Sequence, residues 1–394
     1  MSTLASHSAT ADLPARLLAR VHESLLATPG PVDAERVWAI AHAEGQFIDR
    51  AHLLSLTEQI RDHVHGLGPL QPLVADGVTD ILVNADGSVW VEDAAGLHPT
   101  ALHLSADEAR ALATRLAALG GRRLDDAMPW ADAQLPGGLR FHALLPPLSG
   151  GGAVLSLRRA ATRTLSLDDL EASGTLSPSA REIVEQVVRS RLAFLISGGT
   201  GTGKTTLLSA MLSAASPTER LIIVEDATEL NPRHPHVVRL QARHANAEGS
   251  GEVSLGTLVR QCLRMRPDRI IVGECRGDDV RELLQALNTG HQGGGGTLHA
   301  NTAGDVPARL EALGALAHLD APALAAQALS AIDVILHMDR GGTERRLSTL
   351  AVLTRGADGR LRAESAAMFP PGGRARLLPA FAQLESRLTR EATP

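Results

Sequence analysis

The 394-residue sequence contains no tyrosine and few other aromatic residues, with five Phe and three Trp. This scarcity counts against a protein that grips single-stranded nucleic acid by stacking bases on aromatic rings. Hydrophobic residues still make up 44% of the chain, so it can bury a sizeable core. That core must consist of Leu, Ala, Val and Ile.

Cysteine is equally scarce, with Cys262 and Cys275 as the two examples and no Cys-x-x-Cys pair. This excludes a zinc ribbon and a disulfide framework, and a reduced, cytosolic setting is the simplest interpretation. The N-terminus has no apolar core of the signal-peptide type. No run of about 18 apolar residues occurs, so we expect no segment that spans a membrane by itself.

Excess positive charge is also missing. The formal net charge is −6 and the isoelectric point is about 6.2. Proteins that bind nucleic acid in general are usually basic, so this balance argues against that class, although it leaves room for a local basic channel.

The length predicts two or three domains. Residues 1–65 show helical spacing of apolar residues, and we interpret them as a helical N-terminal extension. Residues 66–160 combine short β-rich runs, an Asp86-Gly87 hairpin signal and a capping-box pattern at Ser105 and Glu108, which indicates a smaller α+β domain. Residues 161–177 are rich in Thr, Ser, Asp and Gly and are interpreted as a linker.

Residues 178–394 form the second predicted domain, with a helical segment at its C-terminal end. Apolar runs of strand length alternate with helical patterns here, which predicts an α/β fold whose mostly parallel sheet is covered on both faces. Within this domain a short apolar strand, 191–197, precedes a glycine-rich loop, and a helix follows from Thr205.

The glycine-rich loop fits the pattern Gly, four residues, Gly-Lys-Thr of a phosphate-binding loop. Its backbone N–H groups can wrap a phosphate, and the helix N-terminus adds positive charge at the same place. Lys204 can reach β- and γ-phosphates, and the Thr205 hydroxyl can ligate Mg²⁺. The predicted nucleotide contacts are Gly198, Gly199, Thr200, Gly201, Thr202, Gly203, Lys204, Thr205 and Thr206.

Two apolar strands end in acids. Residues 221–224 lead to Glu225, with Glu229 four residues on, and residues 269–273 lead to Glu274. Because ligands bind at the carboxyl ends of such strands, Glu225 and Glu274 are candidate Mg²⁺ residues, and an acid there can orient or deprotonate an attacking water. A cap with surface acids, or an acid on the edge of a buried strand, remains the structural alternative.

Histidines and arginines complete the candidate set. His291 and His299 flank the glycine run 293–296, and His299 could sense a γ-phosphate, although a lone histidine is usually structural. Arginines could stabilise charge on a transferring phosphoryl group, or could simply be solvated. The candidates are Arg140, Arg158 and Arg159 before the linker, and Arg243, Arg260, Arg264 and Arg266 between the acid-tipped strands.

Together these residues resemble the type II/type IV secretion ATPases, and most closely the tight-adherence pilus and conjugal-transfer branch. The phosphate loop, the acidic stretch 224–230, the run 263–274 and the histidine motifs 290–291 and 297–301 occur in the family's order. In the N-terminal domain, the stretches 79–84 and 135–148 also match that branch. The likeness covers roughly residues 65–355.

The resemblance implies a RecA-like ATPase domain and a homo-hexamer with ATP and Mg²⁺ in the cleft between the two domains. It implies Glu229 as the catalytic base, Glu274 on the Mg²⁺–water network, His291 and His299 as nucleotide-responsive groups and the N-terminal arginines as phosphate clamps. It further implies work at the inner face of the cytoplasmic membrane, on polytopic platform proteins of a pilus or secretion machine. A helicase-like nucleic-acid motor and a scaffold that binds ATP without hydrolysing it remain the alternatives.

Overall fold

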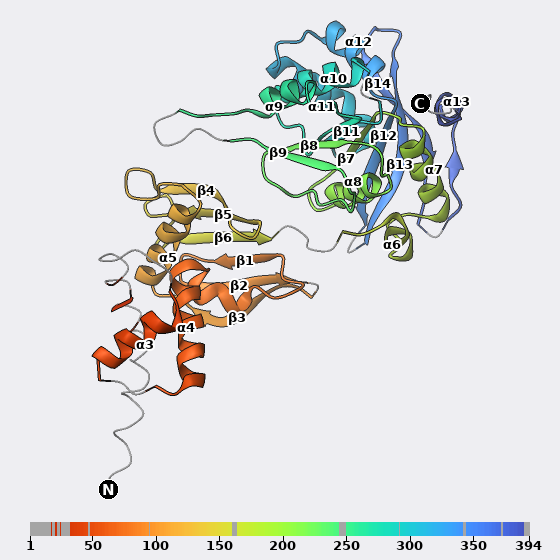
Figure 1. Ribbon diagram of the computed structural model, residues 1–394. Helices are drawn as coiled ribbons and strands as arrows, with labels where there is room; N and C mark the ends of the chain where they lie inside the picture. The colour runs from red at the N-terminus through yellow and green to blue at the C-terminus, as the bar shows by residue number, and fades with distance from the viewer. Residues whose placement is uncertain are drawn as a thin grey trace. The chain divides into compact units, whose positions relative to one another are not determined.

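The computed structural model describes residues 17, 20, 21, 24, 32–45, 48–93, 95–159, 164–243, 250–290, 292–341, 344–371 and 373–389, apart from the side chains of 59 and 62–65. The chain divides into two compact units, residues 1–159 and 160–394 (Figure 1). In the described part of the chain, no helix has both the length and the apolar character that crossing a bilayer requires.

The first unit contains a helical pair and an antiparallel sheet. Helices α3 (Ala34–Ala43) and α4 (Arg50–His65) pack on each other through a small cluster that includes Val37, Ala41 and Ile60. A short 3-10 helix, η1 (Gly68–Leu73), leads to the sheet. The sheet runs in the order β3-β2-β1-β6-β5-β4, with bounds β1 Asp80–Val83, β2 Ser88–Asp93, β3 Gly96–His103, β4 Trp130–Leu135, β5 Leu139–Leu144 and β6 Val154–Arg159.

One face of this sheet is apolar because side chains alternate along each strand. Ile81, Val83 and Phe141 lie on that face and are buried against helix α5 (Ala106–Leu119), which begins at the expected Ser105–Glu108 capping box. The hairpin expected at Asp86-Gly87 joins β1 to β2. Strand β3 was not foreseen, because its sequence, with a central proline, lacks a clear alternating pattern.

The second unit is built on a nine-stranded sheet in the order β15-β14-β13-β12-β7-β11-β10-β8-β9. Strands β9, β8, β10, β11, β7 and β12 are parallel neighbours, and β13 to β15 are added antiparallel at one side. The bounds are β7 Phe194–Gly198, β8 Leu221–Glu225, β9 Val237–Gln241, β10 Arg269–Val272, β11 Gly295–His299, β12 Val334–Gly341, β13 Glu344–Arg355, β14 Leu361–Met368 and β15 Arg376–Leu377.

Helices cover both faces of this sheet (Figure 1). One face carries α6 (Leu167–Ala172), α7 (Pro178–Arg189), α8 (Lys204–Ser213) and α13 (Phe381–Leu388). The other carries α9 (Leu255–Cys262), α10 (Asp279–Asn288), η2 (Ala303–Asp305), α11 (Val306–Leu316) and α12 (Ala321–Ala331). The predicted α/β fold class, with its smaller α+β N-terminal part, is confirmed.

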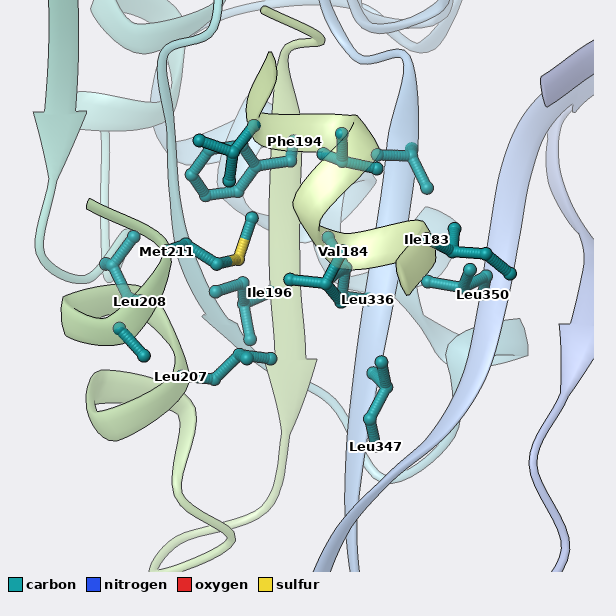
Figure 2. Close-up of a cluster of buried hydrophobic side chains, with 14 of the residues drawn as sticks. Ile183, Val184, Phe194, Ile196, Leu207, Leu208, Met211, Leu336, Leu347 and Leu350 are labelled. Atoms are coloured by element: carbon teal, nitrogen blue, oxygen red, sulfur yellow. The ribbon is translucent and has the colours of Figure 1, made fainter. Parts of the chain in front are cut away.

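The central strand β7 contributes to both layers of core. Phe194 and Ile196 point to the α7–α8 side, where they meet Val184, Leu207 and Met211 (Figure 2). Ala193 and Leu195 belong to the core on the opposite face. Each fully buried Leu, Ile or Phe side chain contributes about 1.5–3 kcal/mol to folding. The strand that carries the glycine loop is therefore held rigidly from both sides.

The second unit begins earlier than the sequence indicated. Residues 161–177 were expected to be a linker, but 167–172 form helix α6, and Leu167, Leu170 and Leu176 lie in the core beside α7 and α8. Ser166 and Asp169 form a capping box at the start of α6. Ser166 and Asp169, which contributed to the linker-like composition, thus cap a helix. The prediction of a linker is therefore wrong for residues 164–177.

Candidate active site

The glycine loop connects the carboxyl end of β7 to the first residue of α8, Lys204. Gly203 precedes this helix with φ +94°, a left-handed conformation that favours glycine. No described side chain caps the N-terminus of α8, and the sequence has no acid in its first turn. The first N–H groups of the helix are therefore available to an anion, as a phosphate site requires.

Lys204 is buried, and its ammonium has three acceptors. Nζ donates to the carbonyl oxygens of Gly198 at 3.0 Å and Gly199 at 2.8 Å, and it lies 3.3 Å from Nδ1 of His299. Burial lowers the pKa of Lys204, while the carboxylates of Glu274 and Glu229 act in the opposite direction. Because an ammonium only donates, Nδ1 of His299 is the acceptor and the ring proton lies on Nε2.

His299 contacts Glu274 through its other ring nitrogen. Its Nε2 lies 2.5 Å from Glu274 Oε1, and Nε of Arg276 donates to Glu274 Oε2 at 2.7 Å. Burial lowers the pKa of His299, and the charge on Lys204 adds to this effect, so the imidazole is neutral at physiological pH. The structure thus brings Lys204, His299 and Glu274 into one connected row.

Thr297 fixes the strand ends that carry this row. Its hydroxyl donates to the carbonyl oxygen of Gly273 at 2.7 Å, which joins β11 to the segment just after β10. Glu274 and His299 follow Gly273 and Thr297 by one and two residues respectively. The hydrogen bond therefore holds the two functional side chains at a fixed separation.

Glu225 ends β8 and is only 4% exposed. Its Oε1 accepts hydrogen bonds from the backbone N–H groups of Glu229 at 3.0 Å and Leu230 at 2.9 Å. Burial raises the pKa of Glu225 to about 7. The side chain therefore shapes the turn that presents Glu229, whose own side chain is exposed. With these two hydrogen bonds Glu225 caps the backbone of the turn, which is the structural alternative given above for this acid.

The predicted Mg²⁺ residues, Thr205, Glu225 and Glu274, do not make a protein cage by themselves. Across the described residues, no group of three or more His, Cys, Asp or Glu could hold a metal ion. Thr205 and Thr206 are half-buried in the first turn of α8. This set fits Mg²⁺, which is usually held by one or two protein groups together with phosphate oxygens and water.

No sequence pattern predicted a buried pair of side chains beside the glycine loop. Ser197, the residue before the loop, lies 2.9 Å through its Oγ from Nδ1 of His337 on β12. His337 is also bonded to the backbone of Asn301, just after β11, and burial lowers its pKa. The pair ties three adjacent strand ends together, and only the parallel pairing of β7 with β12 reveals it.

Arg140 and Arg158, two of the candidate arginines of the first unit, lie on one sheet face, and Arg159, the next residue along β6, points to the other face. Arg140 and Arg158 are directly opposite each other on β5 and β6. Arg140 Nη2 lies 2.9 Å from Asp132 Oδ2, and Arg158 Nε lies 2.8 Å from Asp80 Oδ1. Arg159 Nη1 donates to the carbonyl oxygen of Ala75 at 3.2 Å.

The remaining candidate residues are not part of the row Lys204–His299–Glu274, or they lie outside the residues that the structure describes. His291 lies outside the described residues. Arg260 is engaged by Glu282, with Nη1 2.6 Å from Oε1, and Arg264 donates to the carbonyl oxygen of Arg260 at 3.2 Å. These contacts are what a solvated helix surface shows.

Comparison with known proteins identifies the family of this chain. The family described as "Type II/IV secretion system protein" matches residues 63–340. The protein Rv3659c of Mycobacterium tuberculosis is 55% identical over 314 residues, which cover 77% of this chain and 89% of the relative. The conjugal transfer protein TrbB of Rhizobium radiobacter is 34% identical, with 73% and 90% covered.

Two further likenesses extend the comparison. The type IV secretion system protein PtlH of Bordetella pertussis is 32% identical, with 72% of this chain and 92% of the relative covered. The solved structure of the pilus retraction motor PilT with bound ADP has a TM-score of 0.52 at 20% identity, covering 82% of this chain and 86% of that one, and supports the fold alone. The chain belongs to the type II/IV secretion system protein family.

Proposed function

We propose that this chain is a Mg²⁺-dependent ATPase that works as a homo-hexameric motor at the cytoplasmic face of the membrane. The observation that carries the proposal is the row Lys204–His299–Glu274, which links the phosphate loop to an acid at the end of the neighbouring strand segment. Family membership supports the same function. A relative named for conjugal transfer and another named for type IV secretion favour a pilus or secretion machine.

Lys204 and the N–H groups of the loop would bind the β- and γ-phosphates. For this the ammonium exchanges its contacts with Gly198, Gly199 and His299 for phosphate oxygens. His299 then loses a hydrogen-bond donor at Nδ1 while it keeps Glu274 at Nε2. The imidazole is thus placed to report on the terminal phosphate, since its partner on one side changes when a nucleotide binds.

The two acids suit different tasks. Glu274 is in contact through both carboxylate oxygens, with Arg276 and His299, which suits it to ordering a water molecule in the Mg²⁺ shell. Glu229 is exposed on the turn held by Glu225 and is the proposed base that takes a proton from the attacking water. Bound Mg²⁺, held by Thr205 and phosphate oxygens, would neutralise charge on the phosphates.

The N-terminal arginines and the oligomer belong to the same proposal. Arg140, Arg158 and Arg159 would stabilise phosphoryl charge within the hexamer, as the family resemblance implies. Polytopic membrane proteins would be the partners on which the motor acts, so membrane association would be peripheral. We expect no direct contact with nucleic acid.

Phosphate release from ATP tests the proposal. The wild-type protein should hydrolyse ATP with Mg²⁺, Glu229→Gln should be at least about a hundredfold slower, and Glu385→Gln, an exposed acid on α13, should match wild type. Equal, near-zero rates for wild type and Glu229→Gln in a verified hexamer would favour the scaffold. Strong stimulation by single-stranded DNA at low salt would favour the nucleic-acid motor.

A further inference from the structure

The hairpin formed by β12 and β13 continues beyond the strand that carries the phosphate loop. Strand β12 pairs with β7 only as far as Met338, which lies opposite Gly198. Beyond that point the two strands of the hairpin pair only with each other on this side, through residues 339–341 and 344–346. We call these six residues the β12–β13 arm. The arm therefore runs alongside the glycine loop.

Two arginines of the arm face the loop. A Cβ atom built on Gly201 would lie 3.4 Å from Nη1 of Arg340. One built on Gly203 would lie 3.6 Å from Cδ of Arg345. The guanidinium of Arg340 is thus in van der Waals range of the loop, and the side-chain stem of Arg345 lies beside the start of α8.

The charge pattern of the arm indicates an anionic ligand. Arg340 and Arg345 are directly opposite in the antiparallel register, and like charges at such positions destabilise a hairpin. The arm also contains two acids: Asp339 accepts from the backbone N–H of Arg340 at 2.8 Å and lies 3.5 Å from Nη2 of Arg346, and Glu344, opposite Gly341, is exposed. Two opposed guanidinium groups beside a phosphate loop are favourable when phosphate oxygens lie between them.

The strand order says which part of a nucleotide the arm would meet. Glu225, Glu274 and His299 come from β8, the end of β10 and β11, on one side of β7. The arm comes from β12 and β13, on the other side. A triphosphate whose terminal phosphate faces His299 and Glu274 therefore has its α-phosphate on the side of the arm.

We propose that Arg340 and Arg345 bind the α-phosphate end of the nucleotide, and so set affinity for ATP and ADP alike. This rests on the proposed nucleotide-binding function. Charge-assisted hydrogen bonds of this kind correspond to roughly a tenfold to hundredfold change in the dissociation constant. A group that touched the γ-phosphate would instead affect ATP and leave ADP unchanged.

Calorimetric titration of the full-length protein with ADP, with ATP and with pyrophosphate tests this. In the Arg340→Ala/Arg345→Ala variant, the dissociation constants for ADP and ATP should both rise roughly tenfold to a hundredfold, while that for pyrophosphate stays at the wild-type value. Arg355→Ala removes an exposed arginine from the far end of the same strand β13, and should bind all three ligands like wild type.

The single variant Arg345→Ala is the control for misfolding. Because it removes one of two opposed like charges, its free energy of unfolding should be unchanged or higher than that of wild type. Its affinity for ADP should nevertheless be weaker. ADP binding at the wild-type value in the double variant would overturn this assignment while nucleotide binding itself stands. An equal loss for pyrophosphate would also overturn it, because the arm would then hold the β- and γ-phosphates. If wild type binds neither ATP nor ADP, the proposed function itself fails.

Discussion

Replacing Glu225 by glutamine should make the second unit more stable at alkaline pH. Burial raises the pKa of this carboxyl to about 7 in the folded chain, against an ordinary value of 4.5. The folded state therefore holds the proton more tightly than the unfolded state, and stability falls as pH rises from about 4.5 to 7. Above pH 7 the ionised side chain destabilises the fold by about 3 kcal/mol. Glutamine keeps an oxygen for the N–H groups of Glu229 and Leu230 but carries no charge.

Urea denaturation at pH 8 and pH 5 would measure the effect. Glu225→Gln should raise the free energy of unfolding by about 3 kcal/mol at pH 8, and by less than about 1 kcal/mol at pH 5. Far-ultraviolet circular dichroism is the appropriate probe, because the three tryptophans, Trp38, Trp90 and Trp130, all lie in the first unit. Tryptophan fluorescence serves as an internal control, because the urea transition of the first unit should be the same in the variant and in wild type.

The same variant should lose activity, since Glu225 is a candidate for the Mg²⁺ site and a neutral amide is a poorer Mg²⁺ ligand than a carboxylate. A gain in stability with a loss of function is typical of active-site residues. Equal stability of the variant and wild type at pH 8, or the same difference at both pH values, would refute the argument that burial of a charged carboxylate strains this site.

Four further substitutions have expected outcomes. Lys204→Ala should abolish ATP binding measured by calorimetry, because the phosphates lose their fixed cation, and wild-type affinity would rule out that role. Arg269→Ala should destabilise the second unit by about 3–5 kcal/mol in urea, because buried Glu219 would lose its hydrogen-bonded partner and keep only Arg191, whose Nε lies 3.9 Å away, and a change under about 1 kcal/mol would contradict this. Arg140→Ala and Arg158→Ala should each slow phosphate release without shifting the second unit's unfolding transition, whereas unchanged kinetics for both would remove the clamp proposal.

The sequence predicts those features that depend on local order along the chain. The strand, loop and helix around Lys204, the acid-tipped strands ending at Glu225 and near Glu274, and the hairpin at Asp86-Gly87 all have short-range signals. The glycine run 293–296 allows close backbone approach, since a Cβ on Gly295 would lie 2.3 Å from the carbonyl oxygen of Phe194.

The features that the sequence does not reveal depend on pairing between distant segments. His337 reaches Ser197 across 140 residues, and Arg269 reaches Glu219 across 50. The contact of Arg340 with the loop needs the register of β12 against β7, which no local pattern specifies. Helix α6 was mistaken for a linker because the same Ser and Asp residues serve both turns and helix caps.

The most direct test of the central claim measures ATP binding and phosphate release together in Glu274→Gln. If the row Lys204–His299–Glu274 forms the hydrolytic site, the variant should bind ATP with an affinity close to that of wild type and release phosphate at least about a hundredfold more slowly. Phosphate release at the wild-type rate by this variant would contradict the account.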